Sequence, residues 1–171
     1  MAWTSTGAAG AKLRAANLTT ALTELRPVSI FNGSDEIVSN STAMQDDDEL
    51  VLAVAANTSY RWFADISFGA GTVADYKWGF TFPTGATLTF VSAGWDAALA
   101  FLPSGNGGTY VSGTGIVYGG AGVATLRGIV LRGTLVTGAN AGNLRYQWAQ
   151  NTLTVENTVT KAGSYMEIAK R

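Results

Sequence analysis

Carboxylate side chains are the first candidates for chemistry in this sequence. Asp46, Asp47, Asp48 and Glu49 form an acidic cluster, and carboxylate oxygens are the ligands that calcium prefers. Neighbouring side chains of an extended segment point to opposite faces, so Asp46 and Asp48 do not easily share a site with Asp47. The spacing of an EF-hand loop is also missing. We therefore expect the polar run 45–49 to be exposed and solvated, and we assign no metal site to it.

A pair of carboxylates could also hydrolyse a glycosidic bond. The candidates are Asp65, Asp75 and Asp96, but nothing in their spacing brings two of them together in a cleft. The sequence contains no His and no Cys, which removes the commonest general base, the commonest metal ligand and thiol chemistry. The Gly-rich stretches lack the phosphate-loop pattern. We expect no enzyme activity, no catalytic residues and no cofactor.

Aromatic side chains are the second group that could bind a ligand. A row of rings can stack on sugars, and it can equally build a core, since each buried ring removes about 150–250 Å² from water. The set consists of Trp62, Trp78, Trp95, Trp148, Tyr60, Tyr76, Tyr110, Tyr118 and Tyr146. Strict alternation predicts core positions for Trp62 and Trp78. Trp95, beside a glycine in an expected loop, and Tyr110 are freer, so we place a candidate ligand patch at these two residues.

The composition points to assembly rather than to a charged partner. Charged residues make up 13% and hydrophobic residues 47%, and apolar patches on a weakly charged surface tend to be covered by a partner. The 11 basic and 12 acidic residues nearly cancel, so charge predicts neither nucleic-acid nor membrane-surface binding. No segment approaches the roughly 20 apolar residues of a membrane span.

From Pro27 onward the apolar residues recur with the two-residue period of β-strands. Short strands are expected at 28–31 and 36–38, followed by an apolar strand at 50–54. Two aromatic-faced strands, 60–68 and 76–82, are separated by a short Gly-rich turn, and we expect them to form a hairpin.

Further strands are expected along the rest of the chain, at 87–91, 97–101, 108–118, 123–137, 144–148 and 165–169. In the run 123–137, Gly128 and Gly133 predict bulges or a close approach of another backbone. Many short strands with Gly, Pro and Asn between them predict an all-β fold, a sandwich or barrel.

Residues 1–26 differ from the rest and are expected to form an arm before a β domain at 27–171. A short helix is predicted within Ala11–Leu25, because Leu18, Leu22 and Leu25 fall on one helical face and Pro27 ends the segment. So short a helix is marginal alone and should dock on something. The candidate partner-binding residues of the arm are Trp3, Leu13, Leu18, Leu22 and Leu25.

The segment Leu50–Ala86, LVLAVAANTSYRWFADISFGAGTVADYKWGFTFPTGA, has an "LVLxVxAN" strand, a Tyr that opens a long strand, and an "AD-K-GF-FP-GA" ending. These positions are held by Leu50, Val51, Leu52, Val54, Ala56, Asn57, Tyr60, Ala74, Asp75, Lys77, Gly79, Phe80, Phe82, Pro83, Gly85 and Ala86. Residues 162–168 are similar to a "GS-L" closing strand, and residues 9–18 to an "AG-KL-A-LN" start. Together they resemble a recurrent module in structural proteins of tailed bacteriophages that infect actinobacteria.

The resemblance implies a jelly-roll-like antiparallel β-sandwich, a trimer, and a place in the virion, on the capsid or the tail. Proteins with this module are described as minor tail, head-fibre or decoration proteins. Our preferred hypothesis is a capsid decoration or minor capsid protein, which forms a homo-oligomer and lies on the major capsid protein through its arm. The alternative is a minor tail, tail-fibre or baseplate protein that contacts other tail proteins and binds host-surface carbohydrate.

Overall fold

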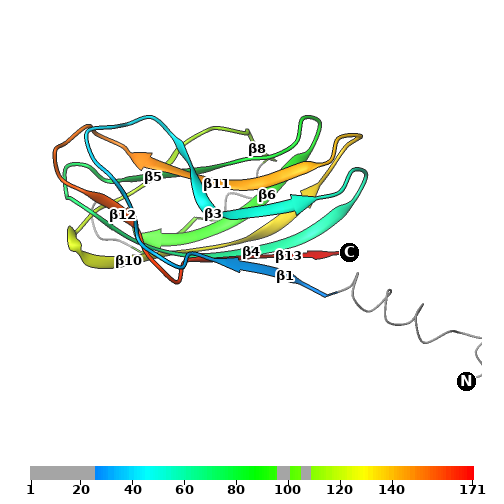
Figure 1. Ribbon diagram of the computed structural model, residues 1–171, viewed down its shortest axis with the longest axis horizontal. Helices are drawn as coiled ribbons and strands as arrows, with labels where there is room; N and C mark the ends of the chain where they lie inside the picture. The colour runs from blue at the N-terminus through cyan, green and yellow to red at the C-terminus, as the bar shows by residue number, and fades with distance from the viewer. Residues whose placement is uncertain (1–25, 96–100, 105–108) are drawn as a thin grey trace, which may run out of the picture.

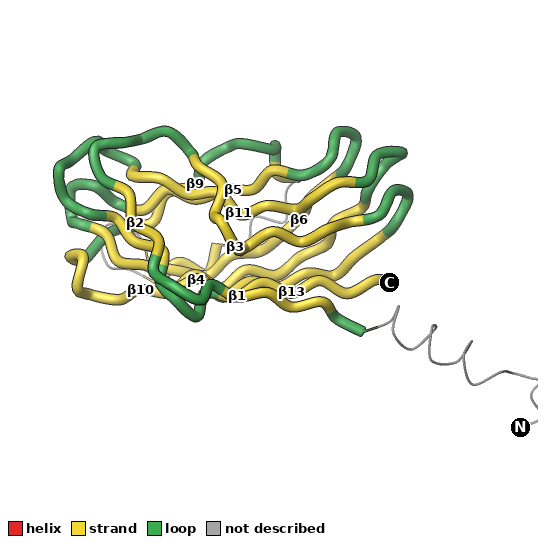
Figure 2. The backbone as a smooth tube through the Cα atoms, viewed as in Figure 1, coloured by secondary structure: helices red, strands yellow, loops and turns green. Residues whose placement is uncertain are grey.

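The computed structural model describes residues 26–95, 101–104 and 109–171, and these residues form two antiparallel β-sheets stacked face to face (Figure 1). The prediction of an all-β sandwich is thereby confirmed. Figure 2 shows strands and loops only, and the described part of the chain contains no helix that is long and apolar enough to cross a membrane. The arm predicted at 1–26 lies outside the described residues except for Arg26, and its helix at 11–25 lies wholly outside them.

Within the described residues, the larger sheet has nine strands and the smaller sheet has four. The larger sheet contains β1 (Val28–Phe31), β2 (Glu36–Val38), β4 (Ser59–Ala70), β6 (Thr87–Trp95), β7 (Phe101–Ser104), β8 (Thr109–Tyr110), β10 (Gly122–Val136), β12 (Thr158–Thr160) and β13 (Tyr165–Lys170). The smaller sheet contains β3 (Gln45–Val54), β5 (Tyr76–Thr81), β9 (Ile116–Tyr118) and β11 (Gly142–Gln150).

Strands that are distant in sequence are neighbours in both sheets. The larger sheet runs β1-β13-β4-β10-β6-β7, with β12 joined to β2 and β4, and with β8 joined to β6. The smaller sheet runs β3-β11-β5-β9. Every pairing between these strands is antiparallel.

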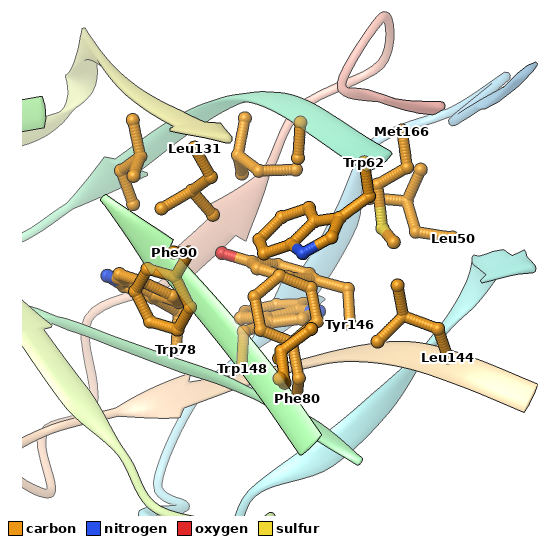
Figure 3. Close-up of a cluster of buried hydrophobic side chains, with 14 of the residues drawn as sticks. Leu50, Trp62, Trp78, Phe80, Phe90, Leu131, Leu144, Tyr146, Trp148 and Met166 are labelled. Atoms are coloured by element: carbon orange, nitrogen blue, oxygen red, sulfur yellow. The ribbon is translucent and has the colours of Figure 1, made fainter. Parts of the chain in front are cut away.

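Bulky rings fill the space between the two sheets (Figure 3). Trp62 of β4 meets Phe80 of β5 edge to face, with ring centroids 5.0 Å apart, and Trp78 stacks on Tyr118 at 5.9 Å. Trp62, Trp78 and Trp148 are buried, so the prediction that Trp62 and Trp78 belong to the core is confirmed. Burial of these rings is the main source of stability, since apolar burial contributes about 25 cal/mol per Å².

The predicted hairpin between 60–68 and 76–82 is wrong. β4 pairs with β10, β12 and β13, whereas β5 pairs with β9 and β11 in the opposite sheet. The turn between them redirects the chain, because the Asp75 N–H donates to the Gly71 carbonyl at 3.1 Å and Asp75 has a φ of 51°. The two aromatic faces therefore meet across the core, as in the Phe68–Tyr76 stack at 4.3 Å.

Two further expectations are corrected, and one strand, β12, was not expected at all. The run 108–118 is not one strand, because a turn in which the Thr114 N–H donates to the Val111 carbonyl separates β8 from β9. Trp95 is the last residue of β6, paired with Phe101, and not part of a loop. The short strand β12 carries no alternating pattern long enough to predict it, and it pairs with two strands at once.

Candidate interaction surface

The outer face of the larger sheet is the most extended candidate site in the described structure. It forms one broad side of the sandwich, where β1, β13, β4, β10 and β6 lie side by side (Figure 1). Alternation along β4 sets its composition: Trp62 and Ala64 point inward and are buried, while Arg61, Phe63 and Asp65 point outward. We name these outward side chains and their neighbours in the other four strands the outer face.

Strand register fixes the positions of the outward side chains relative to one another. Directly paired residues of antiparallel strands project from the same side of a sheet. Phe63 is paired with Glu167 of β13 on one side and with Arg132 of β10 on the other. The three residues therefore form a row across the outer face, which Val91 of β6 extends beyond Arg132.

Two parallel rows flank this central row. Asp65 lies between Tyr165 and Val130. Arg61 lies between Ala169 and Thr134. Phe63 is thus surrounded by four charged side chains, two along its own strand and two across the strands.

The outer face is open to solvent and partly apolar. Phe31 is 66% exposed, Val130 42% and Val136 47%. A broad, open hollow of about 1000 Å³ lies over this region, and its lining includes Arg61, Phe63, Arg132 and Glu167 among others. Its chemistry is that of a contact surface, with exposed apolar side chains between charges of both signs.

Hydrogen bonds hold the acidic side of the outer face in place. The Tyr165 hydroxyl donates to Glu167 Oε2 at 2.7 Å, and the Ser29 hydroxyl donates to the same oxygen at 3.1 Å. The hydrogen bond to Glu167 raises the pKa of Tyr165. The Tyr165 ring lies 6.0 Å from the Phe63 ring, so Glu167 and Phe63 are both positioned by Tyr165.

The candidate ligand patch at Trp95 and Tyr110 is not supported at Tyr110. Tyr110 is 8% exposed, and its ring packs among Phe80, Phe82 and Phe90. Its hydroxyl accepts a hydrogen bond from the Phe80 N–H at 3.0 Å and donates to the Thr114 carbonyl. The expectation that Tyr110 is accessible is therefore wrong, because this side chain satisfies backbone groups at the edge of β5. The Trp95 side chain and the arm residues Trp3, Leu13, Leu18, Leu22 and Leu25 lie outside the described residues.

The acidic run 45–49 is a strand and not a loop; Asp46, Asp48 and Glu49 are exposed as expected, but Asp47 is not. It forms the first half of β3, and Asp47 is only 1% exposed. The strand bulges here, because the register against β11 jumps between Arg145 and Gln147. Asp47 Oδ1 accepts from the N–H of Leu50 at 2.9 Å and from the N–H of Glu49 at 3.2 Å. The carboxylate is thus a structural cap of the bulge.

Burial has an electrostatic cost in this region. Desolvation raises the pKa of Asp47, although Asn32 Nδ2 donates to its Oδ2 at 3.0 Å. Desolvation likewise raises the pKa of Glu36, whose carboxylate accepts from the Asp48 N–H and from Trp148 Nε1. Among the described residues no group of three His, Cys, Asp or Glu side chains could hold a metal ion.

Of the carboxylates considered for hydrolysis, the two that the structure describes, Asp65 and Asp75, are not brought together. Asp65 lies on the outer face, while Asp75 Oδ1 accepts a hydrogen bond from the Gly120 N–H in a turn at 2.9 Å. Asp96 lies outside the described residues.

Sequence reasoning missed the outer face as a site. Alternation in 60–68 already placed Arg61 and Asp65 opposite the core aromatics. The long-range register that brings Arg132 and Glu167 beside Phe63 carries no local signal in the sequence.

Known proteins show no close similarity to this chain. No family model matches the chain, and no curated protein matches it. Two solved structures are similar to it, those of infectious bursal disease virus strain Gt (13% identity, TM-score 0.20) and strain Gx (10% identity, TM-score 0.18). Each alignment covers 85% of this chain and about two-fifths of the viral chain, 42% and 40% respectively. TM-scores of this size carry no argument about fold or function.

Proposed function

We propose that this chain is a non-enzymatic structural protein of a bacteriophage virion, of the capsid decoration or minor capsid class. In this proposal the arm 1–26 attaches the protein to the major capsid protein, and the sandwich makes contacts between subunits. The module resemblance over Leu50–Ala86 motivates the virion assignment.

The observation that carries the proposal is the outer face itself. The outer face exposes Phe31, Val130 and Val136 to solvent. Covering these apolar side chains with a partner would lower the free energy by removing them from water. The charges of both signs around Phe63 would fix the orientation of a partner on this face.

The order of the strands supports the proposal by analogy. β1-β13-β4-β10 faces β3-β11-β5-β9, which we interpret as the two four-stranded sheets of a jelly roll, with β6, β7 and β8 inserted between β5 and β9. Jelly rolls occur in viral capsid domains and also in lectins and cupins. Fold alone does not decide among these, so the contact surface remains the principal argument.

The carbohydrate-binding tail protein receives less support. That alternative relied on Trp95 and Tyr110 as an accessible pair, and Tyr110 belongs to the core. We therefore retain the capsid proposal alone.

Particle binding by the full chain and by a variant without residues 1–25 tests the proposal. Particles of the phage that encodes the chain, prepared without it, are mixed with each protein and sedimented. The full chain is expected to sediment with the particles and to saturate at a fixed number of copies. The truncated variant should stay in the supernatant and yet unfold at nearly the same temperature, because all strands from β1 to β13 are intact. A full chain that does not bind, or a truncated variant that binds equally well, contradicts the proposal.

A further inference from the structure

The charges on the outer face are divided by sign. Ala169, Phe63 and Val130 lie on a diagonal line across β13, β4 and β10, since Ala169 pairs with Arg61 and Val130 pairs with Asp65. Arg61 and Arg132 lie on one side of this diagonal. Asp65 and Glu167 lie on the other side. The outer face therefore has a basic half and an acidic half, with an apolar line between them.

None of these four charges is neutralised by an ion pair within the described part of the chain. The ion pairs found there join Arg145 to Asp46 and Lys161 to Asp35, at other places on the molecule. Arg61, Asp65 and Arg132 are exposed. Glu167 is half-buried, and its Oε2 accepts from Tyr165 and Ser29. The three exposed charges and Glu167 Oε1 are thus available to a partner with the complementary arrangement.

We propose that the outer face binds the outer face of a second copy of this chain, with a two-fold axis along the Ala169–Phe63–Val130 diagonal. Rotation about this axis places the basic half of each copy over the acidic half of the other. Arg132 then meets Asp65 of the second copy, and Arg61 meets Glu167 of the second copy. Phe63 packs on Phe63 of the second copy at the centre, and the contact is isologous.

The dimensions of a β-sheet permit this exchange. Arg132 and Glu167 lie one strand from Phe63, about 4.8 Å, while Arg61 and Asp65 lie two residues from Phe63 along β4, about 6.8 Å. Rotation about this diagonal nearly exchanges the two directions, so each charge falls within about 3 Å of the position of an opposite charge. The strands of the two copies then cross at about 70°, which is closer to the orthogonal than to the aligned packing of two sheets.

Other two-fold arrangements bring like charges together. An axis along β4 places Arg61 over Arg61 and Asp65 over Asp65. An axis across the strands places Arg132 over Arg132 and Glu167 over Glu167. The second diagonal places Arg61 over Arg132. Only the diagonal through Val130 and Ala169 makes all four contacts attractive, and like charges in contact cost several kcal/mol.

The inference names the partner of the surface on which the proposed function depends. It rests on that proposal, because both treat the outer face as an interface. It is tested in solution without particles. A chain that binds particles but does not self-associate contradicts only this inference. A chain that self-associates but does not bind particles contradicts only the virion proposal.

The experiment compares four full-length proteins by sedimentation equilibrium over a range of concentrations. They are the wild type, the single variant Asp65→Arg, and the double variants Asp65→Arg/Arg132→Asp and Asp65→Arg/Arg145→Asp, in which Arg145 lies on β11 of the smaller sheet. The two double variants have identical amino-acid composition and net charge, so each is the matched control of the other. Thermal unfolding of each protein establishes that the sandwich is folded.

We expect the wild type to be a dimer, and not the trimer that the module resemblance implies. Asp65→Arg should dimerise at least about tenfold more weakly, since the substitution acts twice in an isologous contact. Asp65→Arg/Arg132→Asp should recover wild-type dimerisation, because the exchanged pair is attractive again. Asp65→Arg/Arg145→Asp should associate as weakly as Asp65→Arg, because the guanidinium introduced by Asp65→Arg still faces Arg132 of the second copy and the second substitution lies on the other sheet. A wild type that stays monomeric up to about 1 mM, or two double variants that associate equally, would overturn the inference.

Discussion

At the scale of single residues, Tyr110 takes the place of a neighbouring strand at the edge of β5. Its hydroxyl bonds to the Phe80 N–H and to the Thr114 carbonyl, so a side chain completes what backbone pairing does elsewhere in the sheet. Sequence alone could not reveal this, because a tyrosine in a Gly-rich stretch has the same local pattern whether its hydroxyl meets water or a backbone amide.

Replacing Tyr110 with Phe tests this role. The ring packing is retained, but two backbone groups lose their partner, and an unsatisfied buried group costs about 1–3 kcal/mol. We expect Tyr110→Phe to lower the free energy of unfolding in urea by that amount. Tyr165→Phe on the outer face is the control and should cost less, since that hydroxyl bonds to a carboxylate near solvent. Equal losses of unfolding free energy in the two variants would contradict this role of the Tyr110 hydroxyl at the Phe80 N–H and the Thr114 carbonyl.

Asp47 is the second residue whose role is structural, and its charge makes stability depend on pH. The folded state raises the pKa of Asp47 above its ordinary value of 3.8 through desolvation. The folded protein therefore binds the proton more tightly than the unfolded chain. The resulting stabilisation is complete below pH 3.8 and is lost as the pH rises through the raised folded-state pKa.

Replacing Asp47 with Asn removes this titration while keeping an oxygen for the Leu50 N–H. Asn32 Oδ1 has no hydrogen-bond partner in the described structure, and a turned Asn32 amide offers that oxygen to the new NH2 group. We compare the free energy of unfolding in urea of Asp47→Asn and of wild type at about pH 3.5 and at about pH 7. We expect the difference to move in favour of Asp47→Asn at the higher pH, because only the wild type loses stability as Asp47 ionises. Asp47→Ala should cost about 1–3 kcal/mol at both, because the bulge loses its cap. A pH-independent difference between the Asn variant and wild type would contradict this account.

At the scale of strands, Gly133 allows β10 to lie against β6. A Cβ atom at this position would collide with the Thr89 carbonyl oxygen and would lie 2.8 Å from the Phe90 Cα. Gly128 in the same strand has open space where its Cβ would lie. The sequence predicted a bulge or a close approach at both glycines. The structure shows the close approach at Gly133, and the register break in β10 lies between Gly122 and Arg127.

The matched pair Gly133→Ala and Gly128→Ala tests this difference. Gly133→Ala should destabilise the protein by about 1–3 kcal/mol or more, because backbone atoms of β6 cannot move aside cheaply. Gly128→Ala should be neutral or stabilising by up to about 1 kcal/mol, since it restricts the unfolded chain only. Urea unfolding of both variants checks this, and similar losses in the two would contradict the close approach.

Strand positions were predictable where alternation is strong, and strand partners were not. The strands β4 and β5 were placed to within two residues at each end, because apolar and polar side chains alternate there, and β1, β2 and β10 were placed from the turn residues that flank them. The acidic start of β3 was missed, since a bulge interrupts the alternation at Asp47. The 60–68/76–82 hairpin was wrong because two aromatic-faced strands bury their rings equally well side by side or opposite one another.

At the scale of the whole molecule, the topology explains why the outer face could not be found from sequence. Its rows join residues from β13, β4 and β10, which are separated by 35 to more than 100 positions in the chain, as in Phe63, Arg132 and Glu167. Each charge looks like an ordinary solvated residue on its own strand. The division into a basic and an acidic half exists only after the sheet has formed.

The pairing of β1 with β13 also has a practical consequence for labelling. Val28 lies beside Ile168, so the chain enters the sandwich and leaves it at the same end (Figure 1). A fluorescent tag fused after Arg171 would stand next to the segment that we assign to capsid attachment. Tags inserted between β12 and β13 near Gly163 would lie at the other end of the β1–β13 pair, away from that attachment point.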